Sequence, residues 1–369
     1  MRVALDVTAI PPRLTGAGTY VHHLADALGR HAELELHLIA RRDDAARWAP
    51  MGTVHAVAPT PRPVRLAWEQ ASAPALARRI GADVWHGPHY TMPVRLRRPT
   101  VVTVHDLTFF DHPEHHQRMK VPVFRRAITV AARQATALVC VSDRTADRLQ
   151  SLLPVQGRVV VAPHGVDHDR FTPDGDRDED LAALVRVGIR PPYVAYLGTI
   201  EPRKNVPGLV RAFARVQRNH PDLRLVLAGL PGWGSDDVDR AVAHARVGDA
   251  VDRVGYLDAA VVPAFLRRAD AVAYPAFEEG FGLPVLEALA CGAVVITSAG
   301  TVMEDVADGA AVLAPPGDDD ALARAIDRAV AGDADVDARR ARGPDVASRY
   351  TWAATADVHV ALYRDLVVG

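Results

Sequence analysis

The sequence predicts an α/β protein made of two doubly wound, Rossmann-like domains. Short apolar runs alternate with amphipathic helical patterns along most of the 369 residues, and such alternation favours parallel sheets that helices cover on both faces. A chain of this length exceeds the size at which one hydrophobic core usually suffices. We therefore expect one domain at residues 1–170, a linker at 171–190, a second domain at 191–350 and a final helix at 351–369.

The composition is that of an ordinary soluble globular protein, with 49% hydrophobic residues, 24% charged residues and a net charge of −2. A charge so close to zero gives no support to a nucleic-acid partner. The two cysteines, Cys140 and Cys291, lie in apolar surroundings and predict buried free thiols in a reducing compartment. The amino terminus is too short and interrupted for a signal peptide, and no run is long enough to span a bilayer. We expect a cytoplasmic protein.

The first domain should contain six strands with helices between them. Strand-like runs occupy residues 3–7, 34–40, 83–86, 100–105, 137–141 and 158–162. Helical patterns begin at Tyr20 and recur at 66–80, 120–135 and 142–153. Ser142 is a suitable N-cap for the last of these helices.

The loop after the first strand, TAIPPRLTGAGTY, carries Gly16 and Gly18. A strand, a glycine loop and a helix in this order let backbone N–H groups contact a phosphate. The third glycine of a dinucleotide-binding fingerprint is missing, because Val21 occupies its place. This absence argues against a nicotinamide dehydrogenase.

His105 stands at the carboxyl end of the buried-looking strand TVVTV, where open α/β sheets bind ligands. The next segment is rich in potential ligands: His112, His115, His116, Asp111 and Glu114. A metal site would need a fixed geometry, which a loop that contains Pro113 does not promise. A solvated loop near the acceptor is the favoured interpretation.

A basic region surrounds this loop and consists of Arg95, Arg97, Arg98, Arg118, Lys120, Arg125 and Arg126. The favoured interpretation is a solvated face. The alternative is a surface for an anionic acceptor, such as a lipid-linked phosphate sugar, which would bring the protein to the membrane surface.

The second domain opens with YVAYLGTIEPRKN, in which Arg203 and Lys204 separate a strand at 193–197 from a helix that begins at Pro207. Paired cations next to a helix N-terminus can stabilise a diphosphate leaving group. Further strands are expected at 223–228, 251–256, 271–274 and 294–297, and further helices at 318–330, 336–350 and 351–366.

The string YPAFEEGFGLPVLEALACG predicts a strand, a loop with Gly280 and Gly282, and a helix with Pro284 in its first turn. Glu279 lies in the loop and Glu287 lies eight positions later, in the helix. The positive end of a helix attracts anions, so two carboxylates here need another purpose. Accepting hydrogen bonds from sugar hydroxyls is such a purpose.

This string closely resembles the E-x7-E signature of family 4 retaining glycosyltransferases, whose GT-B fold consists of two Rossmann-like domains facing across a cleft. The Gly198-to-Lys204 spacing and the segment PHGVDHDRF are also similar to that family. Two residues depart from its pattern. His164 replaces the usual asparagine, and Thr199 replaces an arginine that partners the lysine in many members, so we expect Arg203 to take over that task.

The resemblance implies transfer of a hexose with retention, by a front-face, oxocarbenium-like route that the leaving phosphate assists and that needs no metal or other cofactor. It also implies roles for individual residues. Arg203 and Lys204 would hold the diphosphate, Glu287 the ribose diol, and Glu279 and His105 the transferred sugar. Backbone groups would contact phosphate, sugar or acceptor oxygens at Gly16, Gly18, Gly280, Phe281, Gly282 and Leu283. The final helix would cross back onto the first domain, and His86 and His89 are weaker candidates for the acceptor side.

The donor is a finer question. GTIEPRKN followed by EEGFGLP is similar to bacterial mannosyltransferases of polysaccharide assembly, so GDP-mannose is the first choice and a UDP-sugar such as UDP-glucose is the rival. A glycan, a lipid-linked sugar and a small molecule remain open as acceptors, and so does the oligomeric state. A catalytically silent GT-B module that binds a partner is the alternative from another functional class.

Overall fold

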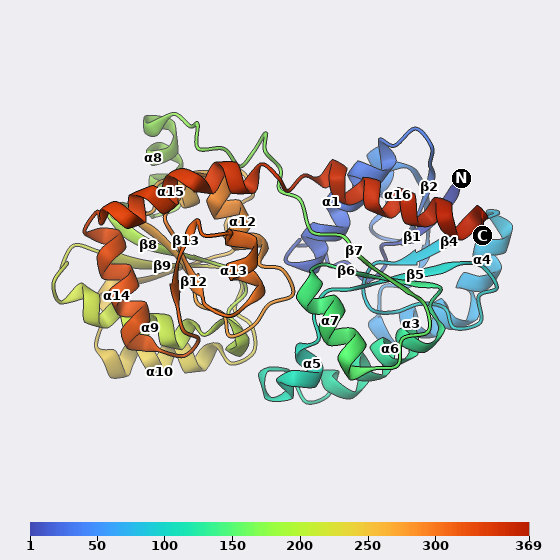
Figure 1. The fold of residues 1–369 in the computed structure, drawn as a ribbon, viewed down its shortest axis with the longest axis horizontal. Helices are drawn as coiled ribbons and strands as arrows, with labels where there is room; N and C mark the ends of the chain where they lie inside the picture. Colours follow the sequence, from blue (N-terminus) through green and yellow to red (C-terminus); the bar gives the residue numbers. More distant parts are fainter. Residues whose placement is uncertain (369) are drawn as a thin grey trace. The chain divides into compact units, whose positions relative to one another are not determined.

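The computed structural model describes residues 1–368, which form two compact α/β units. The first unit comprises Met1–Gly165 together with the last helix, α16 (Trp352–Val368). The second unit comprises Val166–Thr351. Figure 1 shows both units, with many of their helices and strands labelled.

The first unit is built on a seven-stranded parallel sheet with the order β3-β2-β1-β4-β5-β6-β7. Val3 of the central strand β1 is in register with Leu36 on one side and with Val84 on the other. The strands are β1 (Arg2–Asp6), β2 (Glu35–Arg41), β3 (Thr53–Ala58), β4 (Val84–Gly87), β5 (Thr100–Val104), β6 (Ala137–Cys140) and β7 (Arg158–Val161).

Helices cover both faces of this sheet because successive strand residues point to opposite sides. Val3 and Leu5 pack in the cluster that holds α1 and α16, which lie side by side (Figure 1), whereas Ala4 packs with Trp85 and α4. The remaining helical elements are α1 (Ala17–Gly29), α2 (Ala45–Trp48), η1 (Ala49–Met51), α3 (Arg62–Ala71), α4 (Ala73–Arg79), α5 (Thr108–Asp111), η2 (Pro113–His115), α6 (Lys120–Gln134) and α7 (Asp143–Leu152), where η marks a 3₁₀ turn.

The second unit has a six-stranded parallel sheet with the order β10-β9-β8-β11-β12-β13. Its strands are β8 (Tyr193–Leu197), β9 (Arg224–Ala228), β10 (Val251–Gly255), β11 (Ala271–Tyr274), β12 (Val295–Ser298) and β13 (Ala311–Ala314). The strand order reverses between β8 and β11. Ligands of open α/β sheets bind at such a switch point, beyond the carboxyl ends of the strands.

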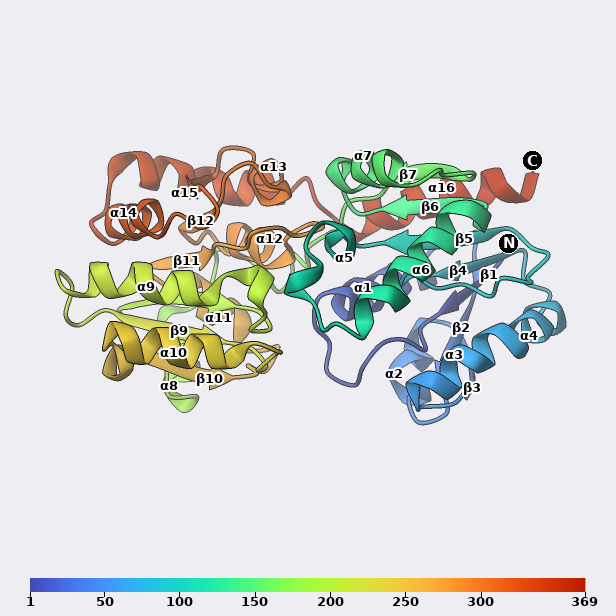
Figure 2. The ribbon, with the colours of Figure 1, turned by 90° about the horizontal axis from the view of Figure 1, so that it is seen from below.

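Helices flank this second sheet as well, and α9 and α10 lie side by side along it (Figure 2). The helical elements are α8 (Arg177–Arg186), η3 (Pro202–Lys204), α9 (Val206–Gln217), α10 (Ser235–Ala245), η4 (Gly248–Ala250), α11 (Val262–Arg267), α12 (Leu283–Ala290), α13 (Val302–Ala307), α14 (Asp319–Val330) and α15 (Ala334–Ala347).

Several local predictions are confirmed. The Ser142 hydroxyl caps α7 by accepting from the Thr145 N–H, and both cysteines, Cys140 and Cys291, are buried free thiols. Other features differ. The strands β3 and β13 were not predicted, and the helix expected at 66–80 is two helices that meet at Ser72.

The stretch 171–190 differs most from expectation, because it contains α8 and belongs to the second unit. Its acidic residues, which suggested a solvated linker, build the helix start. The Asp176 side chain accepts from two backbone N–H groups, and acidic residues fill the first turn, where the helix dipole favours them. Asp180 then pairs with Arg267 and Arg268 of the same unit.

Candidate active site

The loop after β8 buries the ammonium group of Lys204. The residue is 8% exposed, and its Nζ lies 5.6 Å from the centre of the Tyr274 ring. A Cβ on Gly198 would come within 2.9 Å of the same nitrogen, so the glycine makes room for it. Burial lowers the pKa of Lys204, and nearby Glu279 opposes that effect. Only one other residue among the 43 basic ones is a lysine, the exposed Lys120.

Arg203 joins this loop to the loop that follows β11, the neighbouring strand. Its Nη1 lies 2.5 Å from Oε2 of Glu279, and its Nε lies 3.4 Å from Glu201. The Tyr274 hydroxyl donates to the other Glu279 oxygen at 2.7 Å. The motif gave no sign of this pairing, although Tyr274 directly precedes the loop. Both Glu279 oxygens are thus held in place in a side chain that is only 12% exposed.

The electrostatics of Glu279 follow from these contacts. Burial alone would raise its pKa, but the adjacent charges of Arg203 and Lys204 and the Tyr274 hydroxyl outweigh burial and lower the pKa. The carboxylate is therefore ionised at neutral pH. With Glu201, which also lies beside Arg203, the cluster contains two basic and two acidic side chains.

The predicted backbone candidates Gly280, Phe281, Gly282 and Leu283 form the approach to α12. Gly282 caps the helix with a φ of 93°, and a Cβ there would lie 2.7 Å from Cγ of Met303, so glycine is required on two counts. The first turn of α12 has no acidic residue. Backbone N–H groups at such a helix start attract anions.

Glu287 lies on α12, about one turn beyond its start. Burial raises its pKa to about 7, and the charge of Arg170 opposes this shift. Arg170 itself is fixed by donating to the Ala259 carbonyl at 2.7 Å. Arg170 lies in the segment PHGVDHDRF but was not among the predicted site residues. Glu287 is therefore a proton-binding group at physiological pH.

His105 follows β5 in the first unit, and aromatic rings surround its side chain. Its Nε2 lies 2.8 Å from the Pro88 carbonyl oxygen, to which it can only donate. Tyr20 and Tyr90 meet the imidazole edge-on, with centroids 5.0 and 5.5 Å away. Burial lowers the pKa of His105 despite Pro88 and Asp106. A neutral ring that donates from Nε2 presents Nδ1 as a hydrogen-bond acceptor.

Gly16 and Gly18 shape the start of α1 after β1. Gly16 is the residue before the helix, with a φ of 48°, and no atom would obstruct a Cβ there. The Gly18 N–H donates to the Thr15 carbonyl at 2.9 Å, and Gly18 packs near Ile10 and Leu14.

His86 does not fit an acceptor-side role. Its side chain is fully buried, and its ring nitrogens bond the hydroxyls of Tyr363 at 2.6 Å and Thr103 at 2.8 Å. It joins β4 to α16 inside the core. His89 remains part-exposed beside the His105 ring, and burial lowers its pKa to about 3.

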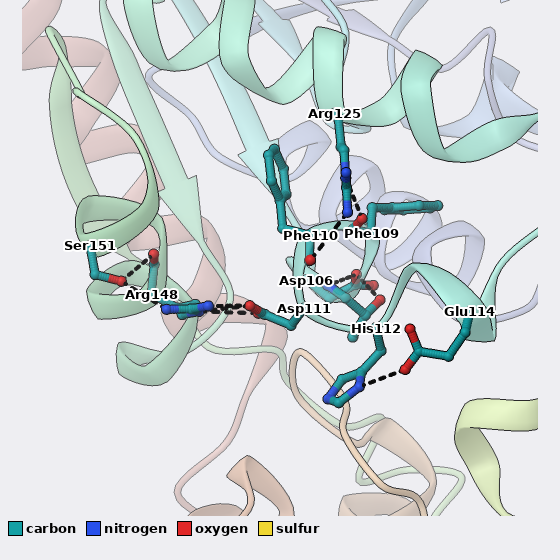
Figure 3. A network of polar contacts seen from close by, with 10 residues as sticks. Asp106, Phe109, Phe110, Asp111, His112, Glu114, Arg125, Arg148 and Ser151 are labelled. Carbon is teal, nitrogen blue, oxygen red and sulfur yellow. Dashed lines mark hydrogen bonds and ion pairs between the residues drawn. The ribbon is translucent and has the colours of Figure 1, made fainter. Parts of the chain in front are cut away.

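The histidine-rich segment, predicted to be a solvated loop, keeps Glu114 exposed and His112, His115 and His116 part-exposed. Residues Pro113–His115 form a 3₁₀ turn, and ligand atoms of His112, Glu114 and His115 lie within 4.8 Å of one another. Figure 3 shows the surroundings of this turn, including the ion pair between Asp111 and Arg148.

Two family models match the chain: "Glycosyl transferases group 1" over residues 185–344 and "Glycosyltransferase Family 4" over residues 14–170. The chain is also 30% identical to the O-antigen chain mannosyltransferase B of Escherichia coli over 274 residues, which are 73% of this chain and 71% of that protein. The chain belongs to glycosyltransferase family 4. It is thus a glycosyltransferase that depends on a nucleotide-sugar donor.

Other similar proteins differ in what their names say they make or bind. This glycosyltransferase is 35% identical to the D-inositol 3-phosphate glycosyltransferase of Stackebrandtia nassauensis, over 78% of this chain and 65% of that one. Among solved structures, sucrose-phosphate synthase of Thermosynechococcus elongatus matches with a TM-score of 0.84 at 22% identity, over 100% and 99% of the two chains. Anabaena HepE in complex with UDP and glucose matches with a TM-score of 0.78 at 17% identity, over 99% and 100%. The fold is GT-B.

Among residues 1–368 of the glycosyltransferase, no helix combines the length and the apolar character that crossing a membrane requires.

Proposed function

We propose that this glycosyltransferase transfers mannose from GDP-mannose, with retention, to a glycan, a lipid-linked sugar or a small molecule. One observation carries the proposal. The cationic pair Arg203 and Lys204 and the carboxylate of Glu279 come together beyond two neighbouring strands, β8 and β11, where the order of the sheet reverses. Charged groups in this position suit a donor that carries both phosphates and sugar hydroxyls.

In the proposed reaction, cationic groups contact the diphosphate and a carboxylate contacts the transferred sugar. The diphosphate gains negative charge as the sugar leaves, and Lys204, Arg203 and the start of α12 would stabilise it. Glu279, ionised and oriented by Tyr274, would accept hydrogen bonds from sugar hydroxyls. In a front-face reaction the leaving phosphate assists the incoming acceptor, so Glu279 need not be a nucleophile and the glycosidase carboxylate pair does not apply.

For Glu287 we propose a bidentate interaction with the ribose diol, since a carboxylate accepts two hydrogen bonds at once. For His105 we propose a contact with the transferred sugar, with Nδ1 accepting from a hydroxyl. For Gly16 and Gly18 we propose backbone approach to phosphate or acceptor oxygens.

The similar proteins leave two donors to distinguish. The E. coli relative is named as a mannosyltransferase, which supports mannose. The HepE structure contains UDP and glucose, which supports a UDP-sugar as the second candidate. We keep UDP-glucose as the rival donor.

We further propose a cytoplasmic enzyme whose acceptor is anionic. All members of the basic region except the part-buried Arg125 are exposed. They could meet an acceptor phosphate or the membrane surface. The inositol-phosphate acceptor in the name of the Stackebrandtia relative supports a phosphorylated acceptor.

A thermal-shift and calorimetric screen tests the donor. The purified chain is mixed with GDP, UDP, ADP, GDP-mannose or UDP-glucose, without added metal, and a ligand that binds the folded state raises the melting temperature. We expect GDP and GDP-mannose to stabilise the wild type and to lose this effect in Glu287→Ala. Glu179→Ala, at an exposed position of the same unit, is the control and should respond like the wild type.

A shift with UDP species alone would keep the enzyme class and overturn the donor. No shift with any nucleotide would favour a module without catalytic activity. Retention is tested separately: NMR of the product formed from GDP-α-mannose should show an α-linkage, and a β-linkage would contradict the proposed route.

A further inference from the structure

One side-chain cluster of the first unit has no part in the proposed reaction. It consists of His112, Glu114 and His115, which we call the 112–115 cluster. One nitrogen from each imidazole and one carboxylate oxygen lie within 4.8 Å of one another. The geometry points to a binding site for a divalent transition metal of the zinc class, held by these three side chains.

The distances are close to those that a metal needs. Nδ1 of His112 lies 3.1 Å from Oε1 of Glu114, and the rings of His112 and His115 are nearly parallel with centroids 5.2 Å apart. Around a tetrahedral zinc ion, ligand atoms are about 3.3 Å apart. Side-chain rotation is needed to bring the third atom into place and to turn the stacked rings so that the lone pairs in their planes converge on one ion.

The backbone explains why the cluster is assembled in advance. Pro113 starts a 3₁₀ turn in which the His115 N–H donates to the His112 carbonyl at 3.0 Å. The turn places His112 and His115 on one side, together with Glu114. This turn fixes the backbone of all three residues before a metal binds. The conformational entropy that would otherwise be lost when the ligands are ordered by the metal is therefore smaller.

Both ends of the turn are anchored to the unit. On one side, the Arg148 guanidinium holds Asp111 through both carboxylate oxygens, at 3.0 and 3.1 Å from its Nε (Figure 3). On the other side, His116 shares a 2.8 Å hydrogen bond with the Thr108 hydroxyl, which donates to Asp106 at 2.6 Å. The anchors keep these groups out of the cluster and hold the cluster itself in place.

The ligand types select the metal. Two imidazoles and one carboxylate suit Zn²⁺, Ni²⁺ or Cu²⁺, whereas Mg²⁺ and Ca²⁺ prefer sites made of oxygen ligands. Three protein ligands leave a further position for water. The side chains of His112 and Glu114 are 40% and 62% exposed, so an ion can reach them. The competing explanation is an ion pair between His112 and Glu114, with His115 stacked on His112.

Metal binding to the tag-free full chain tests the site with Zn²⁺ alone as the probe. Calorimetry of the wild type should show one zinc ion per chain with a matching rise in melting temperature. His115→Ala should weaken binding at least about 10-fold, because losing even a supporting partner of a metal ligand costs about 10–100-fold. His112→Ala and Glu114→Gln should act likewise.

The matched control is His220→Ala. His220 pairs with Asp327 at 3.0 Å in the second unit and has no place in the 112–115 cluster. It should bind zinc like the wild type. The proposal is overturned if the wild type binds no zinc, or if His115→Ala binds it with unchanged affinity and stoichiometry. Neither result concerns nucleotide binding, which is measured separately.

Discussion

The carboxyl edges of the two sheets differ in the charge state of the buried side chains that lie there. In the second unit the loops after β8 and β11 bring together charged groups, Lys204, Arg203 and Glu279, which offset one another's burial. In the first unit His105 and His89 lie among aromatic rings, and burial lowers the pKa of each imidazole. The groups of the second unit, which we call the charged edge, stay charged, whereas the two imidazoles of the first unit, which we call the neutral edge, stay neutral.

The difference shows how burial acts on titratable groups. A buried charge persists where a partner of opposite sign lies within a few ångströms, whereas a buried imidazole without sufficient compensation releases its proton. A charged edge suits phosphates, and a neutral edge with ring faces suits sugar hydroxyls. We therefore expect substitutions in the two units to have different effects on turnover and on nucleotide affinity.

The largest effect is expected for Lys204→Ala. Removing one preorganised group that stabilises developing charge typically lowers kcat about 10²–10³-fold, so we expect a loss of this size in donor turnover. Lys120→Ala removes the only other lysine, which is exposed, and should keep wild-type activity. A loss of less than about tenfold in Lys204→Ala would mean that the charged edge does not hold the leaving group.

Glu287→Gln should have the next largest effect, on affinity. Hydrogen bonds to a charged group contribute about 1.5–3 kcal/mol, so calorimetry with GDP should show an affinity about 10–100-fold lower. Glu179→Ala serves again as the control. An unchanged GDP affinity would remove Glu287 from the nucleotide site.

His105→Ala probes the neutral edge. One hydrogen bond between neutral groups is worth about 0.5–1.5 kcal/mol, so we expect kcat to fall about 2- to 10-fold. GDP affinity should stay the same, because the nucleotide is assigned to the charged edge. His31→Ala, elsewhere in the first unit, is the control. If GDP affinity falls together with kcat, the proposed division of labour between the units is wrong.

The smallest effect on binding or activity is a pH dependence of nucleotide binding. Since the pKa of Glu287 is about 7, the carboxylate that accepts ribose hydroxyls is depleted below this pH. Wild-type affinity for GDP-mannose should fall about threefold from pH 7.5 to 6.5. The Glu287→Gln variant should lack this pH dependence, because its side chain does not titrate. Identical profiles of affinity against pH in the two proteins would contradict the assignment to Glu287.

Stability should respond to pH in the opposite direction. The folded pKa of Glu287 lies above the value of about 4.3 in an unfolded chain, so the folded state binds the proton more tightly between these values. This stabilisation is complete below about pH 4.3 and is lost as the pH rises through 7. Relative to Glu287→Gln, the wild type should lose about 1–3 kcal/mol of unfolding free energy across this range, as measured by urea titration at each pH.

Local sequence signals predicted much of the fold. Strands with continuous apolar character, such as β5 and β11, and helices with a side-chain cap, such as α7, were recognisable because their causes lie within a few residues. The edge strand β3 was missed, since its half-buried residues and His55 obscure the pattern. The helix α8 was missed because an acidic run was taken for solvated chain.

The sequence by itself determined the family motifs, the alternating elements and the identity of Glu279, Glu287 and Lys204 as candidates. Only the tertiary structure decided which of these groups meet. Arg203 and Glu279 are 76 positions apart, and they pair because β8 and β11 are neighbours in the sheet. The same holds for pKa values: Glu279 and Glu287 are chemically identical in the sequence, but two cations lower the pKa of the first while burial raises that of the second. Burial and partners come from chain segments that sequence spacing does not connect, and these surroundings set the charge of each site.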